Sequence, residues 1–335
     1  MKRTKRLFAV ISALAFVFFA SACTAEATAV VYSMDTVSQI KIYADGRDEA
    51  KSLANSAEAL IYRLDHVFSR ESGDIAKLNS GQVSSLSGEA AETVLKALYI
   101  KELSGGAFTP EIGALTRIWN VSGKVGTVAE PPEKCDIEKA LSFTGGAKVE
   151  SSVLTLDGEI ELDLGGIAKG AACEYIVREM ISSGASGGII DLGGNIGVFG
   201  RKPDGSGVYK VALTCAGEAF AYIDVTDAFV SVASSEIRFF TDAEGNTYHH
   251  ILDPETGYPA ESEFYAVAVI CRDGAYADAL STAIFAAGWD KALAMRENCT
   301  TGFDVLALTK TGEVRTTKEY KIISGAETAV PDKYR

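Results

Sequence analysis

Three short stretches of the chain combine side chains that could do chemistry, and the first begins at Asp163. There an acid is followed by Gly165-Gly166 and then by Lys169. A glycine turn that leads into a helix exposes backbone N–H groups, and a lysine in the first helical turn adds positive charge. This combination suits a phosphate group. The alternative is a tight strand-to-helix turn with a surface lysine, because a lone glycine pair is a weak signal.

The second stretch contains two of the chain's three histidines, His249 and His250. Alternate side chains of a strand point to opposite faces, so one histidine can face inward while its neighbour faces outward. Asp253-Pro254 and a Thr256-Gly257 turn follow directly. A histidine at a strand end beside a carboxylate is a candidate general base. The same residues also fit a packed histidine, with Asp253 capping a turn.

The third stretch places Asp278 and Thr282 four residues apart in a run with helical character. Residues at this spacing share one face of a helix. A carboxylate and a hydroxyl directed at one point can hold a hard cation such as Mg²⁺, with phosphate oxygens completing the coordination. The alternative is an ordinary helix whose N-terminal Asp is favoured by the macrodipole.

Helices and strands must position these stretches. Apolar residues at helical spacing predict a helix from Ile167 to Ser183, with Gly184 as its C-cap. It lies between a short alternating run at 160–163 and a strand that begins at Ile189. Further helices are expected over 47–68, 75–78, 90–103, 110–119, 136–143, 275–288 and 290–297, and a loop over 121–132. Strands are expected over 30–43, 208–214, 219–225, 229–233, 248–252, 265–271, 305–308 and 314–317. Separate helices and antiparallel-looking strands predict an α+β fold, with mixed or antiparallel sheets and packed helices.

Composition and charge exclude some partners. The 335 residues are 47% apolar and 23% charged, as in ordinary globular proteins, and the net charge is −13. Phosphate contacts along nucleic acid need clustered Lys and Arg, so an acidic chain argues against a nucleic-acid partner. A bound polyphosphate must therefore be neutralised locally or by a metal ion.

The N-terminus has the pattern of a lipoprotein signal. A basic start, Met1 to Arg6, precedes an apolar stretch from Leu7 to Ala20, and small residues then lead to Cys23. We expect residues 1–22 to be a signal peptide, 23–29 a lipidated tether and 30–325 the folded domain. The protein would then be an exported, membrane-anchored lipoprotein that faces outside the cytoplasm. An ordinary cleaved signal and an uncleaved anchor are the alternatives.

The remaining cysteines have no metal-ligand spacing. They are Cys135, Cys173, Cys215, Cys271 and Cys299. We expect most of them to be buried as small apolar residues. Their spacing assigns no disulfide.

Motifs along nearly the whole mature chain resemble, in their order, those of the ApbE-type FAD:protein FMN transferases. They are Met34-Asp35-Thr36, Ser69 with Leu78-Asn79, Gly106 to Pro110, Leu115 with Trp119, Asp163 to Gly170, Asp191 to Asn195, His250 to Gly257 and Ala277 to Thr282. The resemblance implies an α+β architecture related to the T-fold. It also implies a Mg²⁺-dependent enzyme that moves FMN from FAD to a Thr or Ser hydroxyl of a partner protein and releases AMP.

The resemblance also implies roles for individual residues. Asp278, Thr282 and a main-chain oxygen at Gly166 match metal ligands, and His250 matches the group that takes the proton from the acceptor hydroxyl. The residues that match contacts to FAD are Met34, Ala107, Phe108, Thr109, Asp163, Lys169 and Ile251.

Three positions depart from the family's usual pattern. Thr109 stands where Asp is usual, Ser234-Ser235-Glu236 stands where Thr-Ser-Gly is frequent, and Glu71 lies near a position often held by tyrosine. The first affects a nucleotide contact, the second the acceptor side, and the third the stacking on the flavin.

Three functions fit this reading. The first is transfer of FMN to a subunit of a respiratory redox complex or to a secreted reductase that carries a flavinylation motif. The second is hydrolysis of FAD to FMN and AMP, with water replacing the hydroxyl. The third is a flavin-binding lipoprotein without catalysis. Intact His250, Asp278 and Thr282 favour an enzyme.

Overall fold

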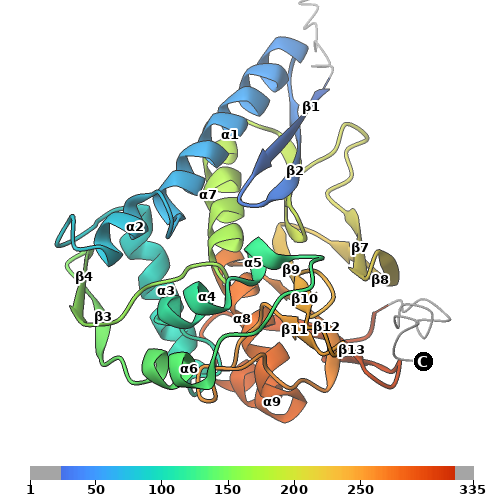
Figure 1. Ribbon diagram of the computed structural model, residues 1–335. Helices are drawn as coiled ribbons and strands as arrows, with labels where there is room; N and C mark the ends of the chain where they lie inside the picture. Colours follow the sequence, from blue (N-terminus) through green and yellow to red (C-terminus); the bar gives the residue numbers. More distant parts are fainter. Residues whose placement is uncertain (1–23, 321–335) are drawn as a thin grey trace, which may run out of the picture.

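The computed structural model describes residues 24–320 (Figure 1). The expected signal peptide, Cys23 and the last residues of the expected domain, 321–325, lie outside the described residues. Within the described range the chain combines helices with antiparallel sheets, so the α+β prediction is confirmed.

One eight-stranded sheet, in the order β1-β2-β5-β6-β9-β12-β13-β14, forms the centre of the fold. Every neighbouring pair in it is antiparallel. Its strands are β1 (Ala25–Ser33), β2 (Thr36–Ala44), β5 (Gly187–Leu192), β6 (Asn195–Gly200), β9 (Ala228–Ser234), β12 (Phe264–Cys271), β13 (Phe303–Thr309) and β14 (Val314–Thr316). Three hairpins form separate sheets: β3 (Gly145–Glu150) with β4 (Val153–Gly158), β7 (Tyr209–Cys215) with β8 (Glu218–Val225), and β10 (Phe239–Thr241) with β11 (Thr247–His249).

The helices lie mainly on one face of this sheet. They are α1 (Arg47–Phe68), α2 (Asp74–Asn79), α3 (Glu89–Leu103), α4 (Gly113–Trp119), α5 (Val121–Lys124), α6 (Lys134–Leu141), α7 (Ala168–Ser182), α8 (Gly274–Ala287) and α9 (Trp289–Asn298). The two faces of the sheet can be seen in β12, because successive side chains of a strand alternate. Val267 and Val269 pack with the helical layer, whereas Ala266 and Ala268 pack with the β7–β8 hairpin.

A smaller core joins α4, α6 and the β10–β11 hairpin. Trp119, Ile137 and Phe240 are buried together there, and the indole N–H of Trp119 donates to the carbonyl of Gly257 at 2.7 Å. Figure 1 shows α4, α5 and this hairpin close together below the β1–β2 hairpin. This core therefore holds the segment that carries His250 against the rest of the domain.

Several predicted elements are confirmed, and some boundaries were wrong. The helix over 47–68 is α1, and the helix between 167 and 183 is α7. The helix expected from Pro110 begins only at Gly113, and the expected loop over 121–132 contains α5. Residues 25–29, expected within a tether, form the start of β1 and pair with β2.

The alternating run at 160–163 is not a strand of any sheet. The backbone N–H and C=O of Leu162 both bond to the side-chain amide of Asn79, each at 2.8 Å. The N–H of Asp163 donates to the carbonyl of Pro110 at 2.8 Å, and Glu161 accepts from Gly113 at 2.9 Å. These bonds replace a strand ladder and fix the segment that leads into α7.

The five cysteines between residues 24 and 320 are free thiols, and Cys173, Cys215 and Cys271 are buried as expected. In the same part of the chain, no helix has both the length and the apolar character needed to cross a membrane.

Candidate functional site

The site is built around a close crossing of α7 and α8. A Cβ on Gly170 would lie 2.2 Å from the carbonyl oxygen of Gly274, and a Cβ on Gly274 would lie 2.5 Å from that of Gly170. Only glycine at both positions lets the two helix backbones approach this closely. The N–H of Gly170 donates to Oδ2 of Asp278 at 2.9 Å. The crossing therefore joins the start of α7, which carries Lys169, to the helix that carries Asp278.

Asp278 is a buried carboxylate whose hydrogen-bond partners among residues 24–320 are neutral groups. It is 5% exposed, and Ser231 on β9 donates to its Oδ1 at 3.1 Å. No ion pair to Asp278 is found within residues 24–320. Burying an unpaired charge is costly, so a carboxylate in this setting fits a nearby cation.

Gly166 lies between two residues that the sequence assigned to the same site. A Cβ placed on it would lie 3.1 Å from the Phe108 ring and 3.5 Å from Oγ1 of Thr282. Thr282 follows Asp278 by one turn of α8. The main chain at Gly166, the Thr282 hydroxyl and the Asp278 carboxylate thus come from one region, and all three offer the oxygen ligands that Mg²⁺ prefers.

That donor set contains a single carboxylate. No cluster of three or more His, Cys, Asp or Glu side chains suited to a metal ion occurs in the described part of the chain. A magnesium ion here would therefore draw on the hydroxyl, a main-chain oxygen, water or the substrate's phosphates, as Mg²⁺ does when it keeps few protein ligands.

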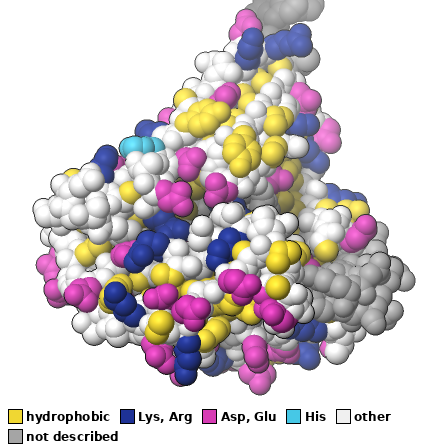
Figure 2. Space-filling view, in the orientation of Figure 1, with side chains coloured by type: hydrophobic (Ala, Val, Ile, Leu, Met, Phe, Trp, Pro, Cys, Tyr) yellow, Lys and Arg dark blue, Asp and Glu magenta, His cyan; other side chains and the backbone are white. Residues whose placement is uncertain are grey.

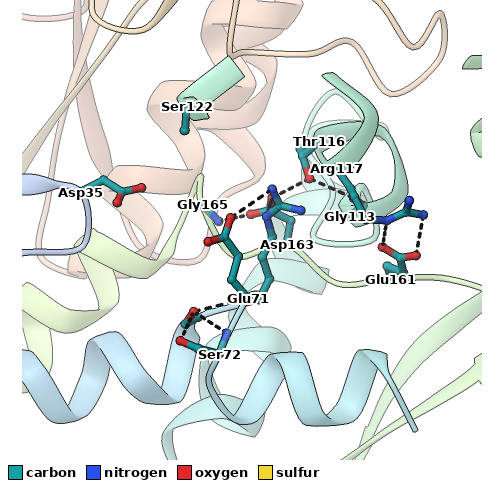
Figure 3. A network of polar contacts seen from close by, with 12 residues as sticks. Asp35, Glu71, Ser72, Gly113, Thr116, Arg117, Ser122, Glu161, Asp163 and Gly165 are labelled. Carbon is teal, nitrogen blue, oxygen red and sulfur yellow. Dashed lines mark hydrogen bonds and ion pairs between the residues drawn. The ribbon is translucent and has the colours of Figure 1, made fainter. Parts of the chain in front are cut away.

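Asp163 organises the turn before α7 (Figure 3). Its Oδ1 accepts from the N–H of Gly165 at 2.6 Å. Its Oδ2 accepts from the Thr116 hydroxyl at 2.6 Å and pairs with Nε of Arg70 at 3.0 Å. In Figure 3, Asp163 lies between Gly165 and the α4 residues Thr116 and Arg117. The carboxylate thus ties three segments together at the site where the sequence predicted an FAD contact.

Three of the amides that lead into α7 are occupied by hydrogen bonds within the turn. The N–H of Gly165 is bonded to Asp163, and the N–H groups of Ile167 and Ala168 both donate to the carbonyl of Leu164. These three amides are not free to bind an anion, so side chains become the more important source of attraction. Lys169 is half-buried, and its Nζ lies 3.5 Å from the carbonyl oxygen of Gly165.

His250 is held by the residue opposite it across a hairpin. The β10–β11 ladder pairs Phe239 with His249, so Arg238 and His250 lie at its end. The carbonyl oxygen of Arg238 accepts from the N–H of His250 at 3.1 Å and lies 3.2 Å from Nδ1 of the ring. A carbonyl can only accept, so Nδ1 carries the proton and Nε2 presents a lone pair. This is the form that a general base needs.

Both histidines are neutral at pH 7. Burial, together with the neighbouring Arg238, His249 and Lys169, lowers the pKa of His250 to about 3. Burial likewise lowers the pKa of His249 to about 4. His249 packs edge-on against Phe285 at 5.7 Å between ring centroids, so it is the packed histidine of the pair.

Asp253 is not the partner of either histidine. Its carboxylate accepts from the N–H of Glu255 and from the hydroxyl of Thr256, each at 2.9 Å. It caps the turn that follows, as the alternative reading expected.

The remaining expected contacts lie on loops around this region. Met34 occupies the β1–β2 turn with φ 52°, and its N–H donates to Asp65 at 3.0 Å. Ala107 is half-buried before Phe108, and Thr109 accepts from the N–H of Glu111 at 3.1 Å. Ile251 is buried, and its carbonyl accepts from the N–H of Ala260 at 2.9 Å.

Three residues escaped the sequence reading: Arg70, Ser231 and Arg238. The guanidinium of Arg238 lies 3.3 Å from the carbonyl oxygen of Asp35 and 3.5 Å from the Ser122 hydroxyl, so it links the β1–β2 turn to α5. The face in Figure 2 is hollowed below the β1–β2 hairpin, and charged side chains of both signs gather there. The short alternating strands on either side of the turn at 242–245 were the signal that could have paired Arg238 with His250.

Comparisons with known proteins identify the family. Residues 34–307 match the ApbE family. The chain is 32% identical over 228 residues to the FAD:protein FMN transferase of Treponema pallidum, covering 60% of each protein. It is 25% identical over 316 residues to that of Haemophilus influenzae, covering 88% of this chain and 90% of the relative.

Solved structures agree with the fold. The ApbE protein of Thermotoga maritima superposes with a TM-score of 0.77 at 25% identity, covering 88% of this chain and 97% of that one. The flavin transferase ApbE of Vibrio cholerae gives a TM-score of 0.70 at 22% identity and covers 91% of this chain and 99% of its own. Fold and family match thus agree over most of the chain, which belongs to the ApbE family.

Proposed function

We propose that the protein is a Mg²⁺-dependent FAD:protein FMN transferase that attaches FMN to a Thr or Ser hydroxyl of an acceptor protein and releases AMP. The relatives in Treponema pallidum and Haemophilus influenzae carry that name. The observation that carries the proposal is the arrangement of His250, whose Nδ1 faces a carbonyl and whose Nε2 is left as an acceptor.

The reaction needs one bond formed, one broken and one proton moved. The acceptor oxygen attacks the phosphorus of the FMN half of FAD, and the bond between that phosphorus and the oxygen of the AMP phosphate breaks. His250 Nε2 receives the hydroxyl proton, and AMP leaves with the bridging oxygen. A positioned base of this kind contributes about 10²–10⁴-fold to the rate.

Charge neutralisation is the second requirement, since phosphoryl transfer depends on positioning and electrostatics more than on covalent chemistry. Lys169 and Arg238 are both close enough to His250 for their charges to lower its pKa. An anionic phosphate between them would be drawn toward the base. Its own negative charge would offset these cations and make His250 a stronger base when the substrate is bound.

Asp278, Thr282 and the main chain at Gly166 would hold the metal ion. When bound, Mg²⁺ supplies positive charge that stabilises the diphosphate and the departing AMP phosphate. Asp278 is suited to this role because it is a buried carboxylate whose contacts are Gly170 N–H and the Ser231 hydroxyl.

We also propose that the protein is exported and anchored in a membrane by lipid at Cys23, so that its acceptor is a redox-complex subunit or a secreted reductase. The sequence pattern before Cys23 supports this. Labelling with radioactive palmitate in cells tests it, with Cys23→Ser as the control. The proposal predicts label on the wild type alone, and equal labelling of both proteins contradicts it.

Product analysis tests the transferase activity. The purified full-length protein is incubated with FAD and Mg²⁺, with and without a peptide carrying a flavinylation motif, and AMP and the peptide mass are followed. Transfer predicts a peptide that gains the mass of FMN and an equal amount of AMP. AMP and free FMN with an unmodified peptide would indicate the hydrolase instead, and FAD binding without AMP would leave a flavin-binding lipoprotein.

A further inference from the structure

A small polar cluster is enclosed between β9 and α8. Ser231 and Ser281 are each 1% exposed, and Asp278 is 5% exposed. Buried polar groups in a core are stable only when their hydrogen bonds are made. Each hydroxyl hydrogen in the cluster therefore needs an acceptor.

The two serines do different things in this cluster. Ser281 donates to the main-chain carbonyl of Asp278 at 2.8 Å, which uses its single hydrogen within α8. Ser231 donates to Oδ1 of the Asp278 carboxylate at 3.1 Å. The two hydroxyl oxygens lie 3.2 Å apart. Of the two serines, Ser231 is therefore the one that donates to the carboxylate.

The Asp278 carboxylate is consequently held from both sides. Oδ1 accepts from Ser231, and Oδ2 accepts from the N–H of Gly170 at 2.9 Å. A carboxylate offers about four lone-pair positions, so each oxygen keeps one for another partner. The two fixed donors set the rotation of the carboxylate and thereby the direction of the positions that remain.

The position of Ser231 is itself rigid. It lies in the middle of the sheet, where its Cα pairs with Asn195 on β6 and with Val269 on β12. Directly opposite residues share a face of an antiparallel pair, so Asn195 stands beside Ser231 on that face. Asn195 is 4% exposed, and its Oδ1 has no hydrogen-bond partner within the described part of the chain. Asn195 is therefore a second buried polar side chain on the helical face of the sheet, beside Ser231.

We propose that Ser231 is a positioning residue for the metal site, and that its hydroxyl orients the Asp278 carboxylate for cation binding. The inference rests on the proposed Mg²⁺-dependent function and adds to it a residue that does not touch the metal or the substrate. Groups that orient a metal ligand typically contribute 10–100-fold to metal affinity.

Calorimetric titration with Mn²⁺, which prefers the same oxygen ligands, tests the inference without measuring turnover. The full-length wild type is compared with Ser231→Ala and with Ser281→Ala, a matched control that removes an equally buried hydroxyl not bonded to the carboxylate. We expect Ser231→Ala to raise the Kd for Mn²⁺ about 10–100-fold. Ser281→Ala should change it less than about threefold.

A fourth protein, Ser231→Thr, keeps the hydroxyl and separates orientation from folding. If Ser231→Ala lowers Tm strongly, the comparison rests on Ser231→Thr, which should bind Mn²⁺ within about threefold of the wild type. Equal affinity for Mn²⁺ of the wild type and a folded Ser231→Ala would overturn the role of Ser231 but not the metal-dependent function. Weak Mn²⁺ binding by a folded Ser231→Thr would do the same. No Mn²⁺ binding by the wild type would instead overturn the metal-dependent function on which the inference rests.

Discussion

The carbonyl oxygen of Arg238 lies 3.2 Å from Nδ1 of His250 and also accepts the backbone N–H of the same histidine. One main-chain atom thus fixes both the place and the tautomer of the proposed base. The geometry comes from a hairpin, because Arg238 and His250 follow directly on the paired residues Phe239 and His249.

This relationship predicts a tautomer that can be measured directly. We expect His250 to carry its proton on Nδ1 at pH 7. Long-range ¹H–¹⁵N correlation spectra of protein labelled at histidine distinguish the two tautomers, and the chain has only three histidines to resolve. His250→Gln identifies the signal. A proton on Nε2 would remove the proposed proton acceptor.

The histidines also predict how stability depends on pH. An unfolded histidine binds a proton below about pH 6.5. Burial lowers the pKa of folded His250 to about 3 and that of His249 to about 4. The unfolded chain therefore binds more protons in this window, so the stabilisation is complete above about pH 6.5 and is lost as the pH falls.

Replacing His250 should make the stability of the protein less sensitive to a fall in pH. Between pH 7.5 and pH 5, one such histidine lowers the free energy of unfolding by about 2 kcal/mol. We measure urea unfolding of the wild type and of His250→Gln at both pH values. The free energy of unfolding should fall less in His250→Gln than in the wild type, by about this amount. His66→Gln, which replaces an exposed histidine, is measured in parallel as the control for loss of a histidine outside the site. An identical decrease in the His250 variant would contradict the buried, neutral histidine.

Arg238 should strengthen FAD binding by its charge. Its guanidinium makes two long hydrogen bonds in the described structure, at 3.3 and 3.5 Å, and lies 4.0 Å from the Asp35 carboxylate, so several of its donors remain available to an anion. We expect Arg238→Gln to raise the Kd for FAD about tenfold, because hydrogen bonds to charged groups contribute about 1.5–3 kcal/mol.

Flavin fluorescence titration measures this affinity, and two variants serve as comparisons. Arg238→Lys keeps the charge and should lose less affinity. Arg201→Gln changes an exposed arginine between β6 and β7 and should leave the Kd unchanged. A Kd that is the same for Arg238→Gln and the wild type would exclude a contact with the diphosphate.

The crossing of α7 and α8 should not tolerate a methyl group. In Gly170→Ala the new Cβ would lie 2.2 Å from the carbonyl of Gly274 and 2.5 Å from Cβ of Asp278. We expect the free energy of unfolding to fall by about 1–3 kcal/mol, since overpacking forces backbone shifts. Thermal and urea unfolding measure this. Gly302→Ala, where nothing lies within 4 Å, is the matched control and should change stability little.

The amphipathic elements could be predicted from the sequence because their information is local. The helical spacing of apolar residues gave both ends of α1, and the strands β7, β8 and β12 were predicted to within a residue or two. The β3–β4 hairpin was missed. Its turn is formed by Ser151 and Ser152, with φ 49° and 63°, so the glycine that usually signals such a turn is absent.

The site could be predicted only in part, because several of its contacts join residues distant in sequence. The spacing of Asp278 and Thr282 placed both on α8. The alternating run that ends at Asp163 has the pattern of a strand, but Leu162 bonds to the side chain of Asn79, a partner that periodicity does not reveal. Ser231 on β9 likewise bonds to Asp278 on α8, 47 residues further along the chain. The alternation of side chains in β9 does not reveal this contact.

Covalent labelling of an acceptor tests the central claim most directly. The full-length protein is incubated with FAD, Mg²⁺ and a Thr-containing flavinylation peptide, and flavin fluorescence that remains on the peptide after denaturation is followed over time. We expect labelling by the wild type and by His66→Gln at similar rates, and a rate lower by about 10²–10⁴-fold for His250→Gln. A wild type that binds FAD without ever labelling the peptide, or a His250→Gln variant that labels it as fast as the wild type, would contradict the account.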